Sequence, residues 1–133
     1  MNTFEEEIIV SNQHLDDLSH VNNIKYVEWV QKIAKTHWKT IASTIMKENY
    51  YWILLEHNIK YLKPAFLNDK LLIKTFVEAT KDIKSSRIVK IYNKDTNELL
   101  MSSYTNWCLI NSKTNKPTRI IDEIKQLFRN SDM

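Results

Sequence analysis

The spacing of hydrophobic residues changes along this chain. From about Asn23 to about Met46, apolar residues recur every three or four positions, which predicts an amphipathic helix. These positions are Val27, Val30, Ala34, Trp38, Ile41 and Ile45, and Tyr26, Trp29 and Ile33 widen the apolar stripe. A helix that is apolar over so much of its circumference needs cover on more than one side, so we expect a sheet to wrap around it.

Segments with a strand-like pattern flank this helix. Phe4 to Gln13 predicts one strand before it, and four segments after it have strand-like length and composition. The four are Tyr51 to Lys63, Leu71 to Lys81, Lys84 to Asn93 and Glu98 to Ile110. In the first of them, alternation places Tyr51, Ile53, Leu55, His57, Ile59 and Tyr61 on one face. Arg119 to Arg129 predicts a short helix, and we expect the chain to fray from Ser131 onward.

The order β-α-β-β-β-β predicts an α+β fold with one long helix and an antiparallel sheet of about five strands. A length of 133 residues fits a single domain over residues 1–133, since no linker, repeat or low-complexity segment interrupts it. The pattern alone does not distinguish a sheet wrapped around its helix from other α+β arrangements.

The chain contains no glycine, which removes several classes of site. Glycine-rich phosphate loops are excluded, and with them the Rossmann and P-loop nucleotide sites. Turns that need a positive φ must then use Asn or Asp, the residues that tolerate this region best after glycine. Candidate positions are Asn68-Asp69, Asn93 to Asn97 and Asn111 to Asn115.

Charge and cysteine content indicate where the protein works. The net charge is +3, and the lysines are scattered along the chain. Such a surface attracts polyanions, but the phosphates of a nucleotide would suffice, so no nucleic acid partner is expected. The single Cys108 excludes an intramolecular disulfide and fits a reducing compartment. Met1 to Glu7 has no basic n-region, and the apolar runs are too short to cross a bilayer, so we expect a cytoplasmic protein.

Residues 14–29 carry the chemistry that the pattern suggests most strongly. Asp16 and His20 precede the helix, and Asn22 or Asn23 lies where the helical periodicity begins and is a good N-cap. Free backbone N–H groups and the positive end of the helix dipole therefore point toward the acid and the histidine. A carboxylate beside such donors can attack a carbonyl, or deprotonate water to attack it, while the donors hold the carbonyl oxygen.

Two motifs in the chain resemble those of hotdog-fold thioesterases. The first is Asp16-x-x-x-His20-Val21-Asn22-Asn23-x-x-Tyr26, and the second is His57-Asn58-Ile59-Lys60-Tyr61-Leu62-Lys63-Pro64-Ala65, followed by Asn68-Asp69. The pattern is similar to 4-hydroxybenzoyl-CoA thioesterase and closer to plant and bacterial acyl-ACP thioesterases, from the first strand to Pro117. The resemblance implies that the sheet wraps the helix, that two subunits join sheets edge to edge, and that active sites lie at their interface.

The resemblance also implies roles for the motif residues. Asp16 would be the nucleophile or general base, His20 would assist, and the backbone N–H of Asn23 would polarise the thioester carbonyl. Asp17 is the alternative acid if the register is offset by one residue. Several acyl-ACP thioesterases carry Asn two residues before the histidine, whereas this chain has Leu18, which favours a simpler mechanism of one acid and a helix terminus.

Other residues are expected to bind substrate or to pack in the core. Asn22 and Tyr26, which lie in the first motif, are expected to contact the substrate. The resemblance also implies CoA contacts from a basic and hydroxylic cluster at a strand junction, which consists of Lys84, Ser85, Ser86 and Arg87. His57 and Cys108 are expected to be core residues, and the four histidines have no metal-ligand spacing. We therefore expect no metal and no cofactor.

The resulting functional prediction is hydrolysis of an acyl-CoA or acyl-ACP thioester by a homodimer or homotetramer. Two alternatives remain: a protein that binds acyl thioesters without turning them over, and a hydratase or dehydratase of the same fold. Lyases of this kind usually pair a histidine with an acid on the helix, and this chain lacks their loop motifs.

Overall fold

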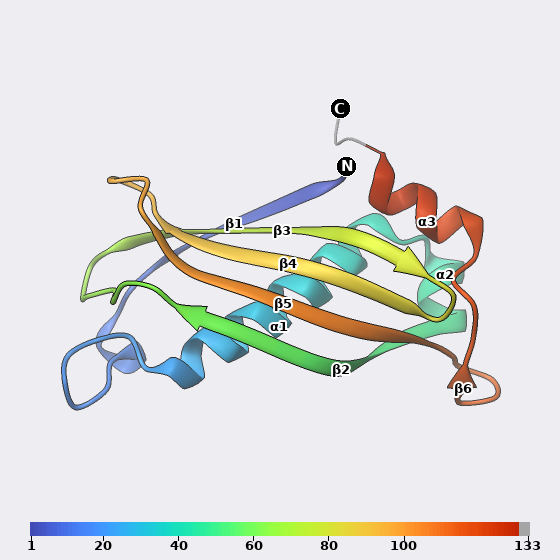
Figure 1. Ribbon diagram of the computed structural model, residues 1–133, viewed down its shortest axis with the longest axis horizontal. Coiled ribbons are helices and arrows are strands. Elements are labelled where there is room, and N and C mark those ends of the chain that lie inside the picture. The colour runs from blue at the N-terminus through green and yellow to red at the C-terminus, as the bar shows by residue number, and fades with distance from the viewer. Residues whose placement is uncertain (131–133) are drawn as a thin grey trace.

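A computed structural model describes residues 1–130 of the chain, so the expected fraying from Ser131 lies outside the described residues. Its elements follow the predicted order, with short additions (Figure 1). They are β1 (Thr3–Ile9), a 3₁₀ turn η1 (Asn12–His14), α1 (Asn23–Ile41), α2 (Thr44–Asn49), β2 (Tyr50–Tyr61), β3 (Lys70–Lys81), β4 (Lys84–Asn93), β5 (Leu99–Asn111), β6 (Lys116–Pro117) and α3 (Asp122–Arg129).

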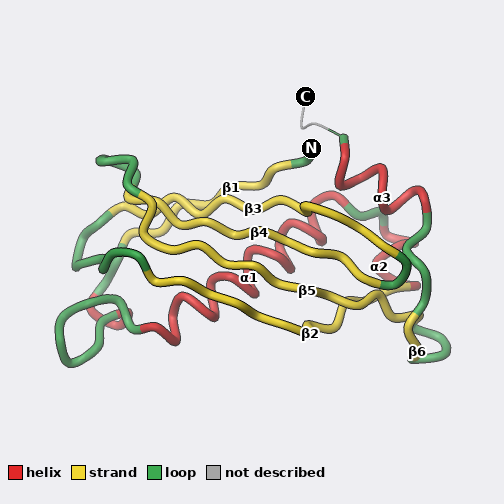
Figure 2. The backbone as a smooth tube through the Cα atoms, viewed as in Figure 1, coloured by secondary structure: helices red, strands yellow, loops and turns green. Residues whose placement is uncertain are grey.

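The five long strands form one antiparallel sheet in the order β1-β3-β4-β5-β2, and β6 adds a short pairing to β5. The sheet curves around α1, which lies along its concave face, and α3 lies at the end of the molecule near the start of β2 (Figures 1 and 2). The prediction of an α+β fold with the sheet wrapped around one long helix is therefore confirmed.

Helix α1 begins where an asparagine caps it and ends sooner than the periodicity predicted. Asn22 Oδ1 accepts a hydrogen bond from the backbone N–H of Ile24 at 3.0 Å, which satisfies one of the free donors of the first turn. The helix ends at Ile41 and not at Met46, because Ser43 caps the separate helix α2 through the N–H of Met46. Ile45, which was predicted to belong to the stripe, consequently lies on α2 and is exposed.

The stripe of α1 supplies the centre of the core. Its buried side chains are Tyr26, Trp29, Val30, Ile33, Ala34, His37 and Trp38. Two clusters divide this core: the first half of α1 packs with the inner residues of β3 to β5, and Trp38 packs with Leu109 and the α3 residues Ile124 and Phe128. Each fully buried Ile or Leu contributes roughly 1.5–3 kcal/mol, so burial of this stripe is what fixes the helix against the sheet.

A β-bulge in β2 makes the predicted alternation of this strand wrong in its second half. Leu54 pairs with Trp107 and Glu56 with Asn106, so that Leu55 is an extra residue. Tyr51, Ile53 and Leu55 are exposed, whereas the residues after the bulge change face. His57 and Ile59 are consequently half-buried on the side that faces α1.

Residues other than glycine adopt a positive φ in three predicted turns and at two further positions that were not predicted. Positive φ values occur at Asn68, Asn97 and Asn115, within the predicted turns, and also at Asp82 and Ser19. The first strand also ends early, at Ile9, because Ser11 starts the 3₁₀ turn that leads toward the motif loop. Ser19 is the unusual case, since serine gains less than Asn or Asp in this region and lies inside the first motif.

Candidate active site

The loop before α1 is built around the carboxylate of Asp16. An isolated bridge between Leu15 and Val21 closes the loop, and the N–H of Asp16 donates to the carbonyl of His20 at 2.8 Å. Asp16 Oδ1 accepts hydrogen bonds from the backbone N–H groups of Leu18, at 2.9 Å, and His20, at 3.1 Å. One carboxylate oxygen is therefore held by the loop, and the side chain remains exposed to a reactant.

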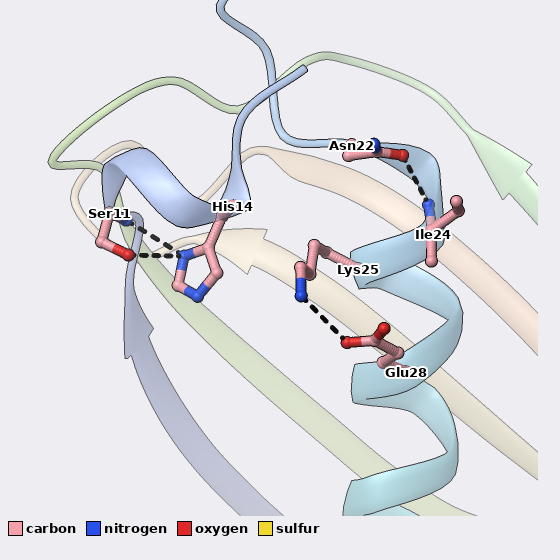
Figure 3. A network of polar contacts seen from close by, with 6 residues as sticks. All are labelled: Ser11, His14, Asn22, Ile24, Lys25 and Glu28. Carbon is pink, nitrogen blue, oxygen red and sulfur yellow. Dashed lines mark hydrogen bonds and ion pairs between the residues drawn. The ribbon is translucent and has the colours of Figure 1, made fainter.

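The first turn of α1 lies next in the chain and offers a free donor. Figure 3 shows Asn22 capping the helix through Ile24, with the Lys25–Glu28 ion pair one turn along at 3.3 Å. Within residues 1–130, the exposed Asn23 has no acceptor for its backbone N–H. An unpaired N–H at the positive end of a helix dipole is suited to hold a developing oxyanion.

The second sequence motif packs directly against the first. The N–H of Val21 donates to the carbonyl of Ala65 at 3.0 Å, and the ring of Phe66 meets the ring of His20 edge-on at 5.1 Å. Asp69 Oδ2 accepts from the N–H of Phe66 at 2.9 Å and so shapes that turn. The two motifs, about forty residues apart in the chain, thus form one site region.

The imidazole of His20 is held by packing and not by Asp16. Among the described residues no hydrogen bond joins the two side chains; their contact runs through the backbone N–H of His20. A fixed Asp–His pair is therefore not present, and any proton transfer by His20 would act on a bound reactant.

His14 is a supporting residue that the sequence analysis did not single out. Its Nδ1 accepts from the N–H of Ser11 at 3.0 Å (Figure 3), and its carbonyl accepts from the N–H of Asn22 at 2.8 Å. Its ring packs edge-on against Trp29. Partial burial, with a smaller contribution from Lys25, lowers the pKa of His14, which favours the neutral ring that accepts this bond.

Three buried polar atoms on the inner side of this region lack a hydrogen-bond partner among the described residues: Tyr26 Oη, His57 Nε2 and Ser103 Oγ. Burial raises the pKa of Tyr26 to about 12, and the nearby backbone of Ala65 opposes the shift only in part. Burial also lowers the pKa of His57. His57 is therefore not the fully satisfied core residue that we expected, because the bulge turns it toward the helix and leaves Nε2 unpaired.

The structure does not bring the four predicted CoA contacts together. Residues 84–87 belong to β4, whose alternation places Ser85 and Arg87 on the buried inner face, whereas Lys84 is exposed and Ser86 half-buried. The four residues follow the β3–β4 turn, as predicted, but their side chains do not form one cluster. Arg87 and Ser85 instead line a cavity inside the sheet.

This cavity has a volume of about 290 Å³ and lies beside the second half of α1. Trp38, which lines it, is sixteen residues beyond Asn22, or about 24 Å along the helix at a rise of about 1.5 Å per residue. Within one chain, the cavity and Asp16 are therefore at opposite ends of α1.

The remaining candidate chemistry is limited. Across residues 1–130, no three side chains of His, Cys, Asp or Glu gather as a metal-binding group. Cys108 is buried, and burial raises its thiol pKa, which disfavours the nucleophilic thiolate. The helices of the described chain are too short or too polar to cross a membrane.

A sheet wrapped around one long helix defines the hotdog fold, and the carboxylate loop before the first turn of the helix is typical of its thioesterases. The family model described as the acyl-ACP thioesterase N-terminal domain matches residues 1–128, and the chain belongs to this family. Its activity class is accordingly that of a thioester hydrolase.

Individual relatives are distant but cover the chain almost completely. The long-chain acyl-CoA thioesterase FadM of Escherichia coli is 22% identical over 125 residues, which cover 90% of this chain and 92% of FadM. A Staphylococcus aureus protein solved in complex with CoA superposes with a TM-score of 0.84 at 15% identity, covering 98% of this chain and 87% of its own. The 12:0-ACP thioesterase from Umbellularia californica has a TM-score of 0.79 at 14% identity, with 93% of this chain and 48% of the plant chain covered.

Proposed function

We propose that this protein hydrolyses an acyl-CoA thioester to a carboxylic acid and free CoA, with Asp16 as the acting carboxylate. The observation that carries the proposal is the position of Asp16: two backbone N–H groups hold Oδ1, and the free N–H of Asn23 starts the adjoining helix. Leu18 stands where several acyl-ACP thioesterases have Asn, and FadM is named for acyl-CoA, so CoA is preferred to acyl carrier protein as the carrier.

The reaction needs only groups that this end of the helix supplies. Asp16 would take a proton from water as the water oxygen attacks the carbonyl carbon, or would attack that carbon itself to give an anhydride that water then cleaves. The carbonyl oxygen would accept a hydrogen bond from the N–H of Asn23 as negative charge develops. In either route the C–S bond breaks as the tetrahedral intermediate from this first attack collapses, which gives the free acid or the anhydride, and the thiolate leaves to be protonated by His20 or by solvent.

We also infer that two copies join through their β2 edges. The two edges of the sheet differ: β1 carries Glu5, Glu6 and Glu7, which discourage pairing, whereas β2 presents exposed Ile53 and Leu55. An antiparallel pairing of two β2 strands is isologous and closes at a dimer.

Such a dimer would complete the site, because α1 and β2 run side by side in opposite directions. Tyr26 near the start of α1 contacts Tyr61 at the end of β2, and Trp38 contacts Trp52 near the start of β2, both at 5.6 Å between ring centroids. Antiparallel β2 pairing therefore places the cavity of one subunit beside the Asp16 end of its partner. The cavity would receive the acyl group, with Tyr26 and Asn22 of the partner subunit shaping its entrance.

We infer a cytoplasmic location and a single domain for this protein. The single, buried Cys108 suits a reducing cytoplasm, and one curved sheet with one continuous helix suits a single domain over the whole chain.

The test is release of CoA thiol from a panel of short, long and aromatic acyl-CoAs, with Asp16→Asn measured beside Asp17→Asn. We expect Asp16→Asn to lower kcat by about 10²- to 10⁴-fold, the usual contribution of a general base, and Asp17→Asn to leave it nearly unchanged. Equal rates for the wild type and Asp16→Asn would refute the site. Acyl-CoA binding without turnover in the wild type would instead identify a binding protein.

The dimer is tested by sedimentation of the intact chain. Wild type is expected to sediment as a dimer or a larger even assembly, and Ile53→Lys as a monomer with little activity, because a charge would be buried in the strand pairing. A monomeric, fully active wild type would exclude the shared site.

A further inference from the structure

The cavity beside the second half of α1 combines aromatic walls with cationic groups. Rings from α1, β2, β5 and α3 form its walls, and they belong to Trp38, Tyr50, Trp52, Trp107 and Phe128. Arg87 and Ser85 line it from the inner face of the sheet, and three exposed lysines, Lys35, Lys39 and Lys47, belong to its border. None of the lining residues is an aspartate or glutamate.

Arg87 is the unusual member of this set, because it is buried without an acid. Its side chain is 5% exposed, and none of the ion pairs among residues 1–130 includes it. Burial lowers the pKa of Arg87 from 12.5 to about 10, so its charge is retained at neutral pH. A desolvated cation without an opposite charge is costly, and proteins rarely keep one without a use.

The hydrogen bonds of this guanidinium go to neutral partners, and its Cζ also lies over the ring of Phe128, 5.9 Å from the ring centroid. Arg87 Nη1 donates to His37 Nδ1 at 2.9 Å and to Thr75 Oγ1 at 3.0 Å. Arginine has no acceptor, so His37 Nδ1 must carry the lone pair, and its Nε2–H then donates to Asn2 Oδ1 at 2.5 Å. All hydrogen bonds of the guanidinium found in the described chain leave from Nη1, which leaves Nη2 and Nε available.

We propose that this cavity binds a small molecule with an apolar body and one carboxylate, and that the guanidinium of Arg87 receives the carboxylate. Two parallel N–H groups of an arginine match the two oxygens of a carboxylate, and the bond is stronger in a dry site. The indole and phenyl walls suit an alkyl or aryl body, and about 290 Å³ is near the lower end for small-molecule sites. A phosphate dianion fits less well, because Arg87 is the one buried cation among the lining residues, whereas the three lysines are exposed.

Two molecules of this chemistry are relevant, and the first rests on the proposed function. An acyl thioester with a second carboxylate at its far end would place that carboxylate on Arg87 while the partner subunit's loop acts on the thioester. A free carboxylic acid would occupy the same site without being a substrate. The two sources differ in whether the distal carboxylate changes turnover.

The binding experiment uses the intrinsic fluorescence of the intact protein, since three of the four tryptophans line the cavity. Wild type is titrated with octanoate and, as the matched neutral ligand, octanamide. We expect saturable binding with octanoate at least 10-fold tighter, as a charge-assisted bond requires. Equal affinities, or no saturable binding of octanoate, would overturn the proposal without any variant.

Arg87→Met and Arg119→Met then form a matched pair, because Arg119 is exposed and its ion pair within residues 1–130 is with Asp82. Arg87→Met should remove the preference for octanoate while circular dichroism confirms its fold, and Arg119→Met should keep the preference. If Arg87→Met fails to fold, the octanoate–octanamide comparison in the wild type still decides the proposal. A folded Arg87→Met that keeps the preference would contradict it.

The turnover arm compares octanedioyl-CoA with octanoyl-CoA. A kcat/KM about 10-fold higher for octanedioyl-CoA, lost in Arg87→Met, assigns the carboxylate to the substrate. Equal kcat/KM values, with Arg87-dependent octanoate binding, assign it to a free acid. Absence of hydrolysis for both esters would refute the proposed function, while the fluorescence result would still decide the proposed ligand.

Discussion

The two ends of α1 hold polar chemistry in opposite ways. At the first end, Asp16 and Asn23 are exposed, and backbone N–H groups of a short loop position the carboxylate. At the second end, His37 and Arg87 are buried, and side chains from three elements position them. The first arrangement leaves a reactive group open to a substrate, and the second removes a charge from water inside the core.

This difference predicts which end carries activity and which carries stability. Changes in the exposed loop should alter the reaction and leave the fold largely intact, because little buried area or desolvated charge depends on them. Changes in the buried network should destabilise the chain, because each lost partner leaves another polar group unpaired in a dry site.

The largest effect on stability is expected from His37→Ala compared with His20→Ala. His37 is fully buried, stacks on Phe4 at 5.3 Å and bonds to Asn2 and Arg87, so its loss combines a cavity with unpaired partners. We expect His37→Ala to cost about 3–4 kcal/mol and His20→Ala less than about 1 kcal/mol. Urea unfolding measures both; similar losses would contradict the contrast between the two ends.

Acid should weaken the same network through protonation of His37. Burial, aided by the nearby charge of Arg87, lowers the pKa of His37 from 6.5 to about 4. Between these values the unfolded chain binds a proton that the folded chain excludes, so stability is full above about pH 6.5 and falls as the pH drops toward 4. A shift of this size corresponds to a loss of about 3 kcal/mol.

The measurement is urea unfolding of wild type and His37→Gln at pH 7.5, 5.5 and 4.5. The pKa values of His14 and His57 are lowered as well, but the wild type and His37→Gln both retain these two histidines. The difference between the two proteins in how stability changes with pH therefore isolates His37. Parallel curves for the two proteins would show that His37 does not carry the acid sensitivity.

The contrast also explains how far the sequence could predict this molecule. The strands and the long helix follow from local spacing and from turn and cap chemistry, and these were predicted. The wrapping of the sheet around the helix was implied by the resemblance of the two motifs to those of a known family. The bulge at Leu55 was not, because it depends on pairing with β5 and leaves no local signal. The bulge places His57 and the following residues of β2 on the opposite face of the strand from the one that the alternation predicted.

The buried network was missed for a related reason. Arg87 was grouped with Lys84, Ser85 and Ser86 at a strand junction because it follows them in the chain. The alternation of β4 was available as a signal and would have separated Ser85 and Arg87 from their neighbours. No sequence signal, however, connects Arg87 to His37 and Asn2, which lie fifty or more residues away and meet only when the sheet closes on α1.

A smaller effect is expected at the start of α1. Asn22→Ala removes the side-chain acceptor of the Ile24 N–H and should cost about 1 kcal/mol, whereas Asn22→Asp keeps the acceptor and should cost little. If the cap also fixes the direction in which the Asn23 N–H points, kcat should fall in Asn22→Ala and recover in Asn22→Asp. A kcat unchanged in both would separate the cap from the oxyanion donor.

The smallest effect on stability concerns Ser19, where the loop holds a non-glycine residue at φ 62°. The left-handed conformation costs an L-residue about 1–2 kcal/mol, and glycine would remove that cost but lose more entropy on folding, so Ser19→Gly should change stability by less than about 1 kcal/mol. The same freedom loosens the turn that aims the N–H groups of Leu18 and His20 at Asp16. We therefore expect kcat to fall a few-fold while unfolding is almost unchanged, as kinetics and urea titration of the same preparation would show. A Ser19→Gly variant with wild-type kcat would mean that the loop is held by its Leu15–Val21 bridge and not by the conformation of Ser19.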